Sequence, residues 1–595
     1  MSDPYLDDAP EGRFQLGFVR ALWPFVRPYR RGFAACLSIL FVSFLLEMAG
    51  PWLLRHAIDG PMRGSDAQDD RMAALAWYAL GFLGTTAGGA LLGYAYGLLT
   101  AWNGQRVIRD VRRHLFDHLL SAGLAFHEKN PAGKLTTRIT SDVENLNELI
   151  ATGVLQSVFD LLKIGGVLVV LFFLDSNLAL FTVATTPVVV LLSVLFRRNA
   201  QRAYRAVRGR LALQNAYTTE LIGGVRTTRA FGREAAVARR YAERNHDTAD
   251  AWRATVLHFS VFFALVDFAL RATTVGLLWF GGTAVLEGTL QPGQFVQFWL
   301  YYALLSGPVK ELGEKYNVLQ AAFASCERVF QMLGEPRFPP PNPDARRTVR
   351  GTPAKVEFDA VSFAYNTGTP VLHELSFTAA PGQTIAIVGP TGAGKTTVLS
   401  LLARLRDVTS GTVRLDGVDV RNLDPDSLRA RIAVVAQDVY LFTGTVLDNV
   451  RLFDRGIDEA RVWRALDTVG ASAFVRGLPQ GLQSQVEERG GTFSQGERQL
   501  LAFARALVVE PDVLVLDEAT ASIDSESEAR LQHALEASLR GRTALVVAHR
   551  LSTVRRADRI LVLEKGHIAE AGTHGELMAR GGIYAHMVAH VEAVR

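Results

Sequence analysis

The sequence predicts a multidomain protein, in which an all-α domain of six transmembrane helices precedes an α/β domain of the phosphate-loop NTPase type. Three observations support this fold class. The chain of 595 residues is too long for one compact core. Hydrophobic residues make up 49% of it, the mean hydropathy is +0.14, and the apolar excess lies before about position 320. Beyond a proline-rich break, short apolar strands alternate with helices, which is typical of a largely parallel sheet.

Six apolar stretches are each long enough to span a bilayer, which takes about 20 helical residues. They are Phe33–Leu54, Met72–Thr100, Leu149–Leu174, Leu178–Phe196, Thr255–Leu286 and Phe295–Leu319. The sixth is the least regular, because Pro308, Lys310 and Glu311 interrupt it. The chain begins MSDPYLDDAPEGRF, which lacks the basic start of a signal peptide, so we expect the first stretch to be retained as a membrane anchor.

Basic residues are unevenly distributed among the segments that connect the predicted spans. They cluster before the first span, between the second and third, and between the fourth and fifth; examples are Arg27, Arg30, Arg106, Arg109, Arg197 and Arg198. The alternate connections are short or acidic, as in Asp66, Asp69 and Asp70. By the positive-inside rule, we expect the N-terminus and the α/β domain on the cytoplasmic side of the cell membrane.

The two long basic connections have a helical pattern. Apolar residues recur at four-residue spacing, as in Val107, Val111, Leu115 and Leu119, so the membrane helices are predicted to continue into the cytoplasm. Each extension is expected to reverse at a short segment, near Phe126–Pro131 and near Glu220–Arg226.

Gly334–Pro353 is rich in proline and charge and is predicted to be an extended linker. Strands are expected after it, at Thr384–Val388, Arg431–Ala436, Val513–Leu516 and Ala544–Ala548. The predicted domains are therefore a cytoplasmic N-terminal segment (1–32), a six-helix transmembrane domain (33–325), a linker (326–355) and the α/β domain (356–590).

The run Gly389-Pro-Thr-Gly-Ala-Gly-Lys395-Thr396 matches the phosphate-loop pattern G-x-x-x-x-G-K-[ST]. It follows a predicted strand and precedes an apolar helical run, which is the context that the motif requires. The glycines let backbone N–H groups converge on phosphate oxygens at a helix N-terminus. Lys395 is expected to reach the β- and γ-phosphates, and Thr396 to bind Mg²⁺. The alternative is a glycine-rich turn without a ligand, which the flanking strand and helix argue against.

Val513–Leu516 ends in two carboxylates, Asp517 and Glu518. In a parallel sheet the carboxyl ends of the strands face the ligand crevice. We expect Asp517 to hold the Mg²⁺ shell and Glu518 to activate the attacking water as a general base. A surface turn is the alternative for this pair taken alone.

From Val356 to Ala589 the chain resembles the nucleotide-binding domain of ABC transporters, with the family's motifs in order. Tyr365 of Phe-Ala-Tyr resembles the aromatic residue that stacks on adenine, and Gln437 the glutamine that senses Mg²⁺. Phe493-Ser-Gln-Gly-Glu-Arg-Gln resembles the signature, Ser-Ile-Asp524 the D-loop, and His549 the histidine on the γ-phosphate.

This resemblance implies ATP and Mg²⁺ as ligands, with Glu518 and His549 as the catalytic residues. The implied Mg²⁺ ligands are Thr396, Gln437 and Asp517. The implied ATP contacts are Tyr365, Gly389, Thr391, Gly392, Ala393, Gly394, Lys395, Thr396, Thr397, Gln437, Ser494, Gly496 and Asp524. Each of three has a plainer alternative: Tyr365 as a core-edge aromatic, His549 as a core histidine and Gln437 as a turn residue.

The signature differs from the family's commonest form, Leu-Ser-Gly-Gly-Gln. Phe493 replaces the leucine, Gln495 the first glycine, and Glu497 the final glutamine, whereas Ser494 and Gly496 are kept. The kept serine hydroxyl and backbone N–H groups are the ones that bind the γ-phosphate on the opposite subunit. The strength of this half of the ATP site is left open.

The first 320 residues resemble the six-helix membrane domain of ABC exporters, in the spans, the two long inner connections and Glu220-Leu-Ile-Gly-Gly-Val-Arg226. The resemblance implies a half-transporter that exports a hydrophobic drug or a lipid and works as a dimer of twelve helices. Lys395 of one chain would face Ser494 of the other, and the helix reversals would dock on the partner's cassette. Both a homodimer and a heterodimer are open. A paralogous partner is preferred, because this signature resembles that of the intact half of heterodimeric bacterial exporters.

Two other functions are compatible with parts of this pattern. A peptide exporter has the same architecture, and a nucleotide-gated channel or regulator has the same fold; the retained Glu518 and His549 argue against the latter. The net charge of +4 gives no argument for nucleic acid as a partner. Charges inside spans, at Asp160 with Lys163 and at Asp267 with Arg271, are expected either to neutralise each other in pairs or to contact the cargo.

Overall fold

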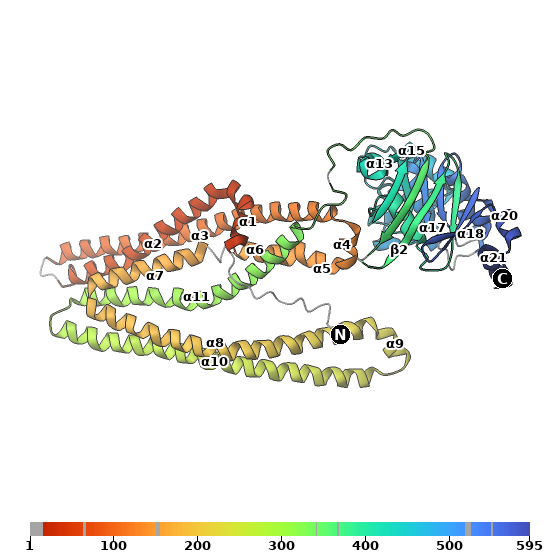
Figure 1. The fold of residues 1–595 in the computed structure, drawn as a ribbon. Helices are drawn as coiled ribbons and strands as arrows, with labels where there is room; N and C mark the ends of the chain where they lie inside the picture. The colour runs from red at the N-terminus through yellow and green to blue at the C-terminus, as the bar shows by residue number, and fades with distance from the viewer. Residues whose placement is uncertain are drawn as a thin grey trace. The chain divides into compact units, whose positions relative to one another are not determined.

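The structure is a computed structural model that describes residues 16–63, 67–149, 155–340, 342–365, 368–517, 525–548 and 551–594. Its contacts divide the chain into two compact units (Figure 1). One unit comprises Met1–Asp117 and Gly133–Gly334, and the other His118–Ala132 and Glu335–Arg595. The short segment His118–Ala132 therefore belongs with the α/β part of the chain.

The first unit is helical. Its elements are α1 (Leu16–Val26), a 3-10 turn (Arg27–Tyr29), α2 (Arg30–Asp59), α3 (Gln68–Leu120), α5 (Ala132–Thr137), a π-helical turn (Arg138–Asp142), α6 (Val143–Glu148), α7 (Leu155–Leu174), α8 (Ser176–Gly223), α9 (Val225–Ala230), α10 (Glu234–Leu286) and α11 (Pro292–Leu333). α8 and α10 run side by side along their length, and α11 packs against α2 and α7 (Figure 1).

Long helices carry the predicted spans. Among the described residues, four helices are long and apolar enough to cross a membrane: the stretch Arg20–Asp59 that includes α2, and α3, α7 and α10. The fourth and sixth predicted stretches lie on α8 and α11. Bulky apolar side chains point outward, including Trp77, Phe173 and Phe268, which are 75%, 88% and 72% exposed. Such surface is costly in water, so these helices are suited to lipid.

The helices continue well past the predicted spans, as their charge and apolar pattern suggested. α3 runs to Leu120 and buries Val107, Val111, Leu115 and Leu119, and α8 runs to Gly223 before the chain bends at Gly224. The first reversal is α4 (Leu124–Lys129), which lies in the unit of the chain's own cassette. The expectation that both reversals would dock on a partner's cassette is therefore wrong for α4.

Of the two charge pairs predicted within the spans, Asp160 with Lys163 does not form, whereas Asp267 with Arg271 does. Asp160 is buried and bonds Lys315 of α11, whereas Lys163 Nζ lies 2.6 Å from Glu47 Oε1 of α2. Asp160 and Lys163 therefore each pair with another helix. The second pair behaves as expected, because Arg271 donates to Asp267 on the same helix at 2.7 Å. Each carboxylate thus has a cationic partner, which lowers the cost of placing it among apolar helices.

The second unit contains α4 and the α/β cassette. Its strands are β1 (Val356–Ala364), β2 (Pro370–Ala379), β3 (Thr384–Val388), β4 (Ser410–Leu415), β5 (Val418–Asp419), β6 (Ile432–Val435), β7 (Gly444–Thr445), β8 (Gln485–Val486), β9 (Val513–Asp517), β10 (Thr543–Val547), β11 (Arg559–Glu564) and β12 (His567–Gly572). Its other helices are α12 (Lys395–Leu402), α13 (Pro425–Arg431), α14 (Val446–Arg451), α15 (Glu459–Thr468), α16 (Ser472–Gly477), α17 (Gln495–Val508), α18 (Ser525–Leu539), α19 (Leu551–Arg556), α20 (His574–Arg580) and α21 (Ile583–Val594), with 3-10 turns at Val420–Asn422, Gly481–Gln483 and Glu488–Gly490.

A six-stranded sheet positions the candidate site. Its order is β12-β11-β3-β10-β9-β6, and the five strands from β11 to β6 are parallel, whereas β12 is antiparallel. β3, β9 and β10 are short and almost fully buried on both faces, which is why their sequences are continuous apolar runs. The four strands expected from the sequence are β3, β6, β9 and β10. A second, antiparallel sheet of order β2-β1-β4-β5 was not predicted.

Candidate functional site

The loop between β3 and α12 has the backbone that phosphate binding needs. Gly389, Gly392 and Gly394 have φ angles of 150°, 84° and 97°, in the region that only glycine adopts without strain. A Cβ on Gly389 would lie 2.2 Å from the carbonyl oxygen of Leu563, and one on Gly394 would lie 2.6 Å from Leu372 Cδ2. The loop therefore has no room for a side chain at Gly389 or Gly394. It leads directly into the N-terminus of α12, where backbone N–H groups attract anions.

Lys395 is the first residue of α12 and is buried. Its ammonium Nζ donates to the carbonyl oxygens of Gly389 at 2.8 Å and Pro390 at 3.0 Å, so the cation lies against the loop. Burial lowers the pKa of Lys395, and the Asp517 carboxylate opposes this shift. A desolvated cation beside a glycine loop is suited to a polyphosphate.

Thr396 and Asp517 come together although they are far apart in the sequence. The Thr396 hydroxyl donates to Asp517 Oδ2 at 2.9 Å, because α12 follows β3 and Asp517 ends β9, with β10 alone between the two strands. Both supply oxygen, the ligand that Mg²⁺ prefers, and Mg²⁺ sites commonly use only one or two protein ligands. No cluster of three His, Cys, Asp or Glu suited to a metal occurs among the described residues. The pair fits a magnesium ion that is shared with a phosphate ligand.

Gln437 follows β6, the neighbour of β9, and its side chain is exposed. The loop after it is fixed by Arg505 of α17, whose Nη1 donates to the Tyr440 carbonyl oxygen and whose Nε donates to that of Asn449, both at 2.9 Å. Burial lowers the pKa of Arg505. Sequence reasoning missed this arginine, since its role depends on a carbonyl group 65 residues away.

Tyr365 lies just after β1 and is 46% exposed, so it is not a core residue. Its hydroxyl is 2.9 Å from the Thr397 Oγ1, which ties the ring to the first turn of α12. The ring meets buried Phe363 edge-on, at 5.0 Å between centroids and 85° between planes. An exposed aromatic face beside the phosphate loop is suited to a flat base.

The signature forms the start of α17. Ser494 caps this helix, because its hydroxyl accepts from Glu497 N at 3.3 Å while Glu497 Oε2 accepts from Ser494 N at 2.8 Å. Glutamate and glutamine both complete such a capping box, which explains why Glu497 is compatible with this helix start. Phe493 packs edge-on against Phe474 at 5.5 Å in the helical layer. Two of the three departures from the common signature, Phe493 and Glu497, are therefore accommodated in the fold.

The predicted residues fall into three groups. Gly389, Gly392, Ala393, Gly394, Lys395, Thr396, Thr397, Tyr365 and Asp517 surround one loop, with Thr391 exposed at its tip. Ser494 and Gly496 lie at the start of α17 in the helical layer, and Gln437 lies at the edge of the sheet between them. Glu518, Asp524 and His549 lie outside the described residues.

Comparisons with known proteins agree with this geometry. A family model described as ABC transporter transmembrane region matches residues 33–309, and one described as ABC transporter matches residues 372–521. The uncharacterized ABC transporter ATP-binding protein YknV of Bacillus subtilis (strain 168) is 35% identical over 596 residues, 98% of this chain and 96% of the relative. The probable multidrug resistance ABC transporter ATP-binding/permease protein YheH of the same organism is 38% identical over 498 residues, 83% of this chain and 73% of the relative. A solved bacterial Atm1-family ABC exporter with ATP bound has a TM-score of 0.80 and 28% identity, and the match covers 94% of this chain and 98% of that one.

Proposed function

The chain belongs to the ABC transporters of the exporter type, and from that premise we propose that it couples ATP binding and hydrolysis to the outward transport of a lipophilic drug or lipid. One observation carries the proposal. A phosphate loop with a desolvated lysine and a Thr396–Asp517 pair stands in the same polypeptide as a bundle of long helices with apolar outer surfaces. The energy source and the path across the membrane are thus joined in one chain.

The chemistry of ATP cleavage follows from where these groups lie. The N–H groups of the phosphate loop and Lys395 bind and orient the β- and γ-phosphates. Bound Mg²⁺ would neutralise charge on the phosphate oxygens, and Thr396 and Asp517 are the residues that would hold it, with Gln437 just after the neighbouring strand. Glu518, the residue after Asp517, accepts the proton of the attacking water, and His549 binds the γ-phosphate.

The working unit is a pair of chains. Ser494 lies at the start of α17 and Lys395 at the start of α12, in different layers of one cassette. A second cassette in the opposite orientation supplies the Ser494 hydroxyl and the N-terminus of α17 to the γ-phosphate. Since ATP favours the closed pair, its binding shifts the helices toward the outward-facing state and hydrolysis reverses this shift. The comparisons do not favour a paralogous partner over an identical one.

The cargo is proposed from the helical unit. Two charges of α7 are each paired with another helix, Asp160 with Lys315 and Lys163 with Glu47, so neither of these two presents an unpaired charge to a ligand. The similarity to a relative named as a multidrug resistance transporter supports a lipophilic compound. The basic connections support an N-terminus and cassette in the cytoplasm.

The test is ATP hydrolysis and transport by the full chain in lipid vesicles, with Glu518→Gln as the catalytic variant and Glu510→Gln as its control. Glu510 lies on the surface, with its carboxylate 3.4 Å from Arg461, so its variant should keep full activity. Loss of the general base should lower hydrolysis about a hundredfold or more while ATP still binds. Uptake of a lipophilic dye into inside-out vesicles should stop with it.

Partner identity is tested in the same preparation. If chains carrying two different tags purify together and hydrolyse ATP, identical subunits form both sites. If a folded chain binds ATP without turnover, a different subunit is required. Hydrolysis by Glu518→Gln at the parent rate would refute the catalytic assignment, and dye transport without ATP would refute the coupling.

A further inference from the structure

A cation lies over the ring that we propose as the adenine platform. The guanidinium carbon of Arg406 is 4.7 Å from the centroid of the Tyr365 ring. Phe363 meets the same ring edge-on, and the Tyr365 hydroxyl is held by Thr397. The ring is therefore restrained at its hydroxyl and by its contacts with Phe363 and Arg406, while the residue stays 46% exposed. An aromatic ring has two faces, and the second can take a flat base.

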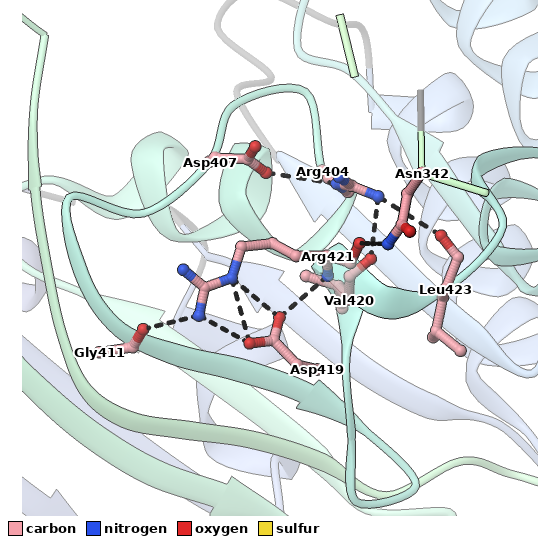
Figure 2. Close-up of polar contacts among 8 residues, drawn as sticks. All are labelled: Asn342, Arg404, Asp407, Gly411, Asp419, Val420, Arg421 and Leu423. Atoms are coloured by element: carbon pink, nitrogen blue, oxygen red, sulfur yellow. Dashed lines mark hydrogen bonds and ion pairs between the residues drawn. The ribbon is translucent and has the colours of Figure 1, made fainter. Parts of the chain in front are cut away.

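Arg406 is itself held firmly. Its side chain is only 10% exposed, although it ends in a charge, and its Nη2 donates to the Glu128 carboxylate of α4. The turn that carries it is anchored on both sides, as Figure 2 shows. Arg404 Nη1 donates to the carbonyl oxygens of Val420 at 3.2 Å and Leu423 at 3.4 Å, and Arg404 Nε donates to Asp407 at 3.3 Å.

A second ion pair, between Arg421 and Asp419, lies close to the turn that carries Arg404 and Asp407. Arg421 donates to both carboxylate oxygens of Asp419 and to the Gly411 carbonyl oxygen at 3.2 Å, and Asn342 reaches the Arg421 carbonyl at 3.4 Å (Figure 2). The Asp407 carboxylate, the acidic group nearest to Arg406 in the sequence, accepts from Arg404. The Arg406 guanidinium contacts the Tyr365 ring and the Glu128 carboxylate. These two groups come from different parts of the chain.

Glu128 belongs to the helix reversal, not to the cassette sequence. The reversal segment is nevertheless fastened to the chain that enters the cassette. Phe338 N donates to the Ser121 carbonyl oxygen at 2.8 Å, and His118 Nε2 lies 2.9 Å from the Glu335 carbonyl oxygen. Glu128 is thus placed by α3 and α4, and it reaches Arg406 across 278 residues of sequence. A cluster of three side chains, Glu128, Arg406 and Tyr365, joins the reversal to the base of the nucleotide site.

We propose that Arg406 is a positioning residue for the adenine base, and that Glu128 sets its position according to where α4 lies. The proposal rests on the proposed function, since it needs Tyr365 to stack on adenine. A ring already restrained in its stacking orientation loses less conformational freedom when a base binds. Binding free energies are linked reciprocally. If the Glu128–Arg406 contact strengthens adenine binding, adenine binding strengthens the Glu128–Arg406 contact by the same free energy. Adenine recognition and the position of α4 are then coupled through one guanidinium.

The experiment compares two competitors for the fluorescent nucleotide TNP-ATP on the full chain in nanodiscs. ATP contains the base, whereas inorganic tripolyphosphate engages the phosphate loop alone. The variants are Arg406→Ala, Arg406→Lys, Glu128→Gln and Tyr365→Ala. The control is Asp359→Asn, which removes another ion pair of β1, 3.2 Å from Arg414, on the strand that precedes Tyr365.

We expect Arg406→Ala to weaken ATP about five- to thirtyfold, the range for a partly desolvated cation over a ring, and to leave tripolyphosphate within twofold. Arg406→Lys should restore part of the loss, and Glu128→Gln should weaken ATP about two- to fivefold in the same selective way. Glu128 is half exposed, so this variant folds even if Arg406→Ala does not. Hydrogen exchange in residues 124–129 should slow with ATP but not with tripolyphosphate, and Arg406→Ala should abolish the difference.

Three outcomes overturn the proposal. Equal losses for ATP and tripolyphosphate would show a general structural defect. Tighter ATP binding by Arg406→Ala would show that the guanidinium covers the face that adenine needs. If Glu128→Gln and the control have the same affinities for ATP and tripolyphosphate, the position of α4 does not affect adenine binding. If Tyr365→Ala leaves the ratio of the two affinities unchanged, the adenine platform itself is wrong; if it lowers the ratio and Arg406→Ala does not, only this inference fails.

Discussion

Asp142 is a buried carboxylate on which the helical unit depends, and replacing it by asparagine is the sharpest test of how that unit is held. The carboxylate accepts four hydrogen bonds. Arg328 of α11 donates twice, at 2.5 Å to Oδ1 and 3.1 Å to Oδ2, Arg138 donates to Oδ2 at 2.7 Å, and Ser325 donates to Oδ1 at 2.9 Å. The Asp142 side chain is 4% exposed. It joins the π-helical turn to α11 through one charge.

Asp142→Asn keeps the shape and removes the charge between two guanidinium groups. Breaking a buried, hydrogen-bonded ion pair on one side costs about 3–5 kcal/mol, because the remaining charge is left poorly solvated. One kcal/mol shifts the melting temperature of a unit of this size by about 2–4 °C, so the expected loss is about 6–20 °C. The assay is the thermal unfolding of the purified full chain in detergent. Asp250→Asn is the control, since Asp250 and Arg253 form an exposed pair at 2.8 Å that is worth less than about 1 kcal/mol.

The difference in stability between the parent and Asp142→Asn should depend on pH in a defined direction. Burial raises the pKa of Asp142, but the hydrogen bonds from Arg328, Arg138 and Ser325 outweigh it and hold the pKa below the ordinary value of 3.8. A carboxylate with a lowered pKa stabilises the fold above its unfolded pKa, and this contribution is lost as the pH falls through the folded pKa. The gap between the parent and Asp142→Asn should be constant above about pH 5 and narrow in more acidic buffer.

Two results would refute this reasoning. One is a melting temperature for Asp142→Asn equal to that of Asp250→Asn. The other is strict additivity of Asp142→Asn with Arg328→Met, because two partners in one hydrogen-bonded cluster must show coupling when both are changed.

Two further predictions concern the cassette. Gly389→Ala should abolish nucleotide binding, measured by TNP-ATP fluorescence, because its Cβ would lie 2.2 Å from the Leu563 carbonyl oxygen; binding within threefold of the parent would show that the loop can relax. Glu497→Gln should keep the capping box with Ser494 and remove a negative charge near the helix start, so the melting temperature should stay within about 2 °C. The ATP concentration for half-maximal hydrolysis should fall, because a carboxylate near the start of α17 repels the γ-phosphate that this helix would bind. A rise would contradict this electrostatic argument.

The phosphate loop was predictable because its chemistry is local. A strand, six loop residues and a helix that are consecutive in the chain place Gly389, Lys395 and Thr396 together, and the structure has them as β3, loop and α12. The extensions of the helices beyond the predicted spans were predictable for a similar reason, since a four-residue apolar spacing marks one face of a helix. Val107 and Leu115 are fully buried, as that spacing requires.

The pairing of charges was not predictable from spacing. Asp160 and Lys163 lie three residues apart on α7, and that spacing suggested a pair, yet each bonds a residue of a different helix. A side chain in a bundle chooses among several neighbouring helices, and which helices adjoin is decided by packing over the whole unit. The antiparallel sheet β2-β1-β4-β5 was missed because its strands are less uniformly apolar than the buried parallel ones.

The sequence alone determined the family, the order of the two domains and the residues of the phosphate loop, because each depends on the identity and spacing of neighbouring residues. Only the tertiary structure decided that Thr396 bonds Asp517 and that Arg406 lies between Tyr365 and Glu128. The Thr396–Asp517 and Glu128–Arg406 contacts join segments more than a hundred residues apart. The order of the strands in the sheet brings Thr396 to Asp517, and the packing of α4 brings Glu128 to Arg406. The distance between such groups in space cannot be inferred from their separation along the chain.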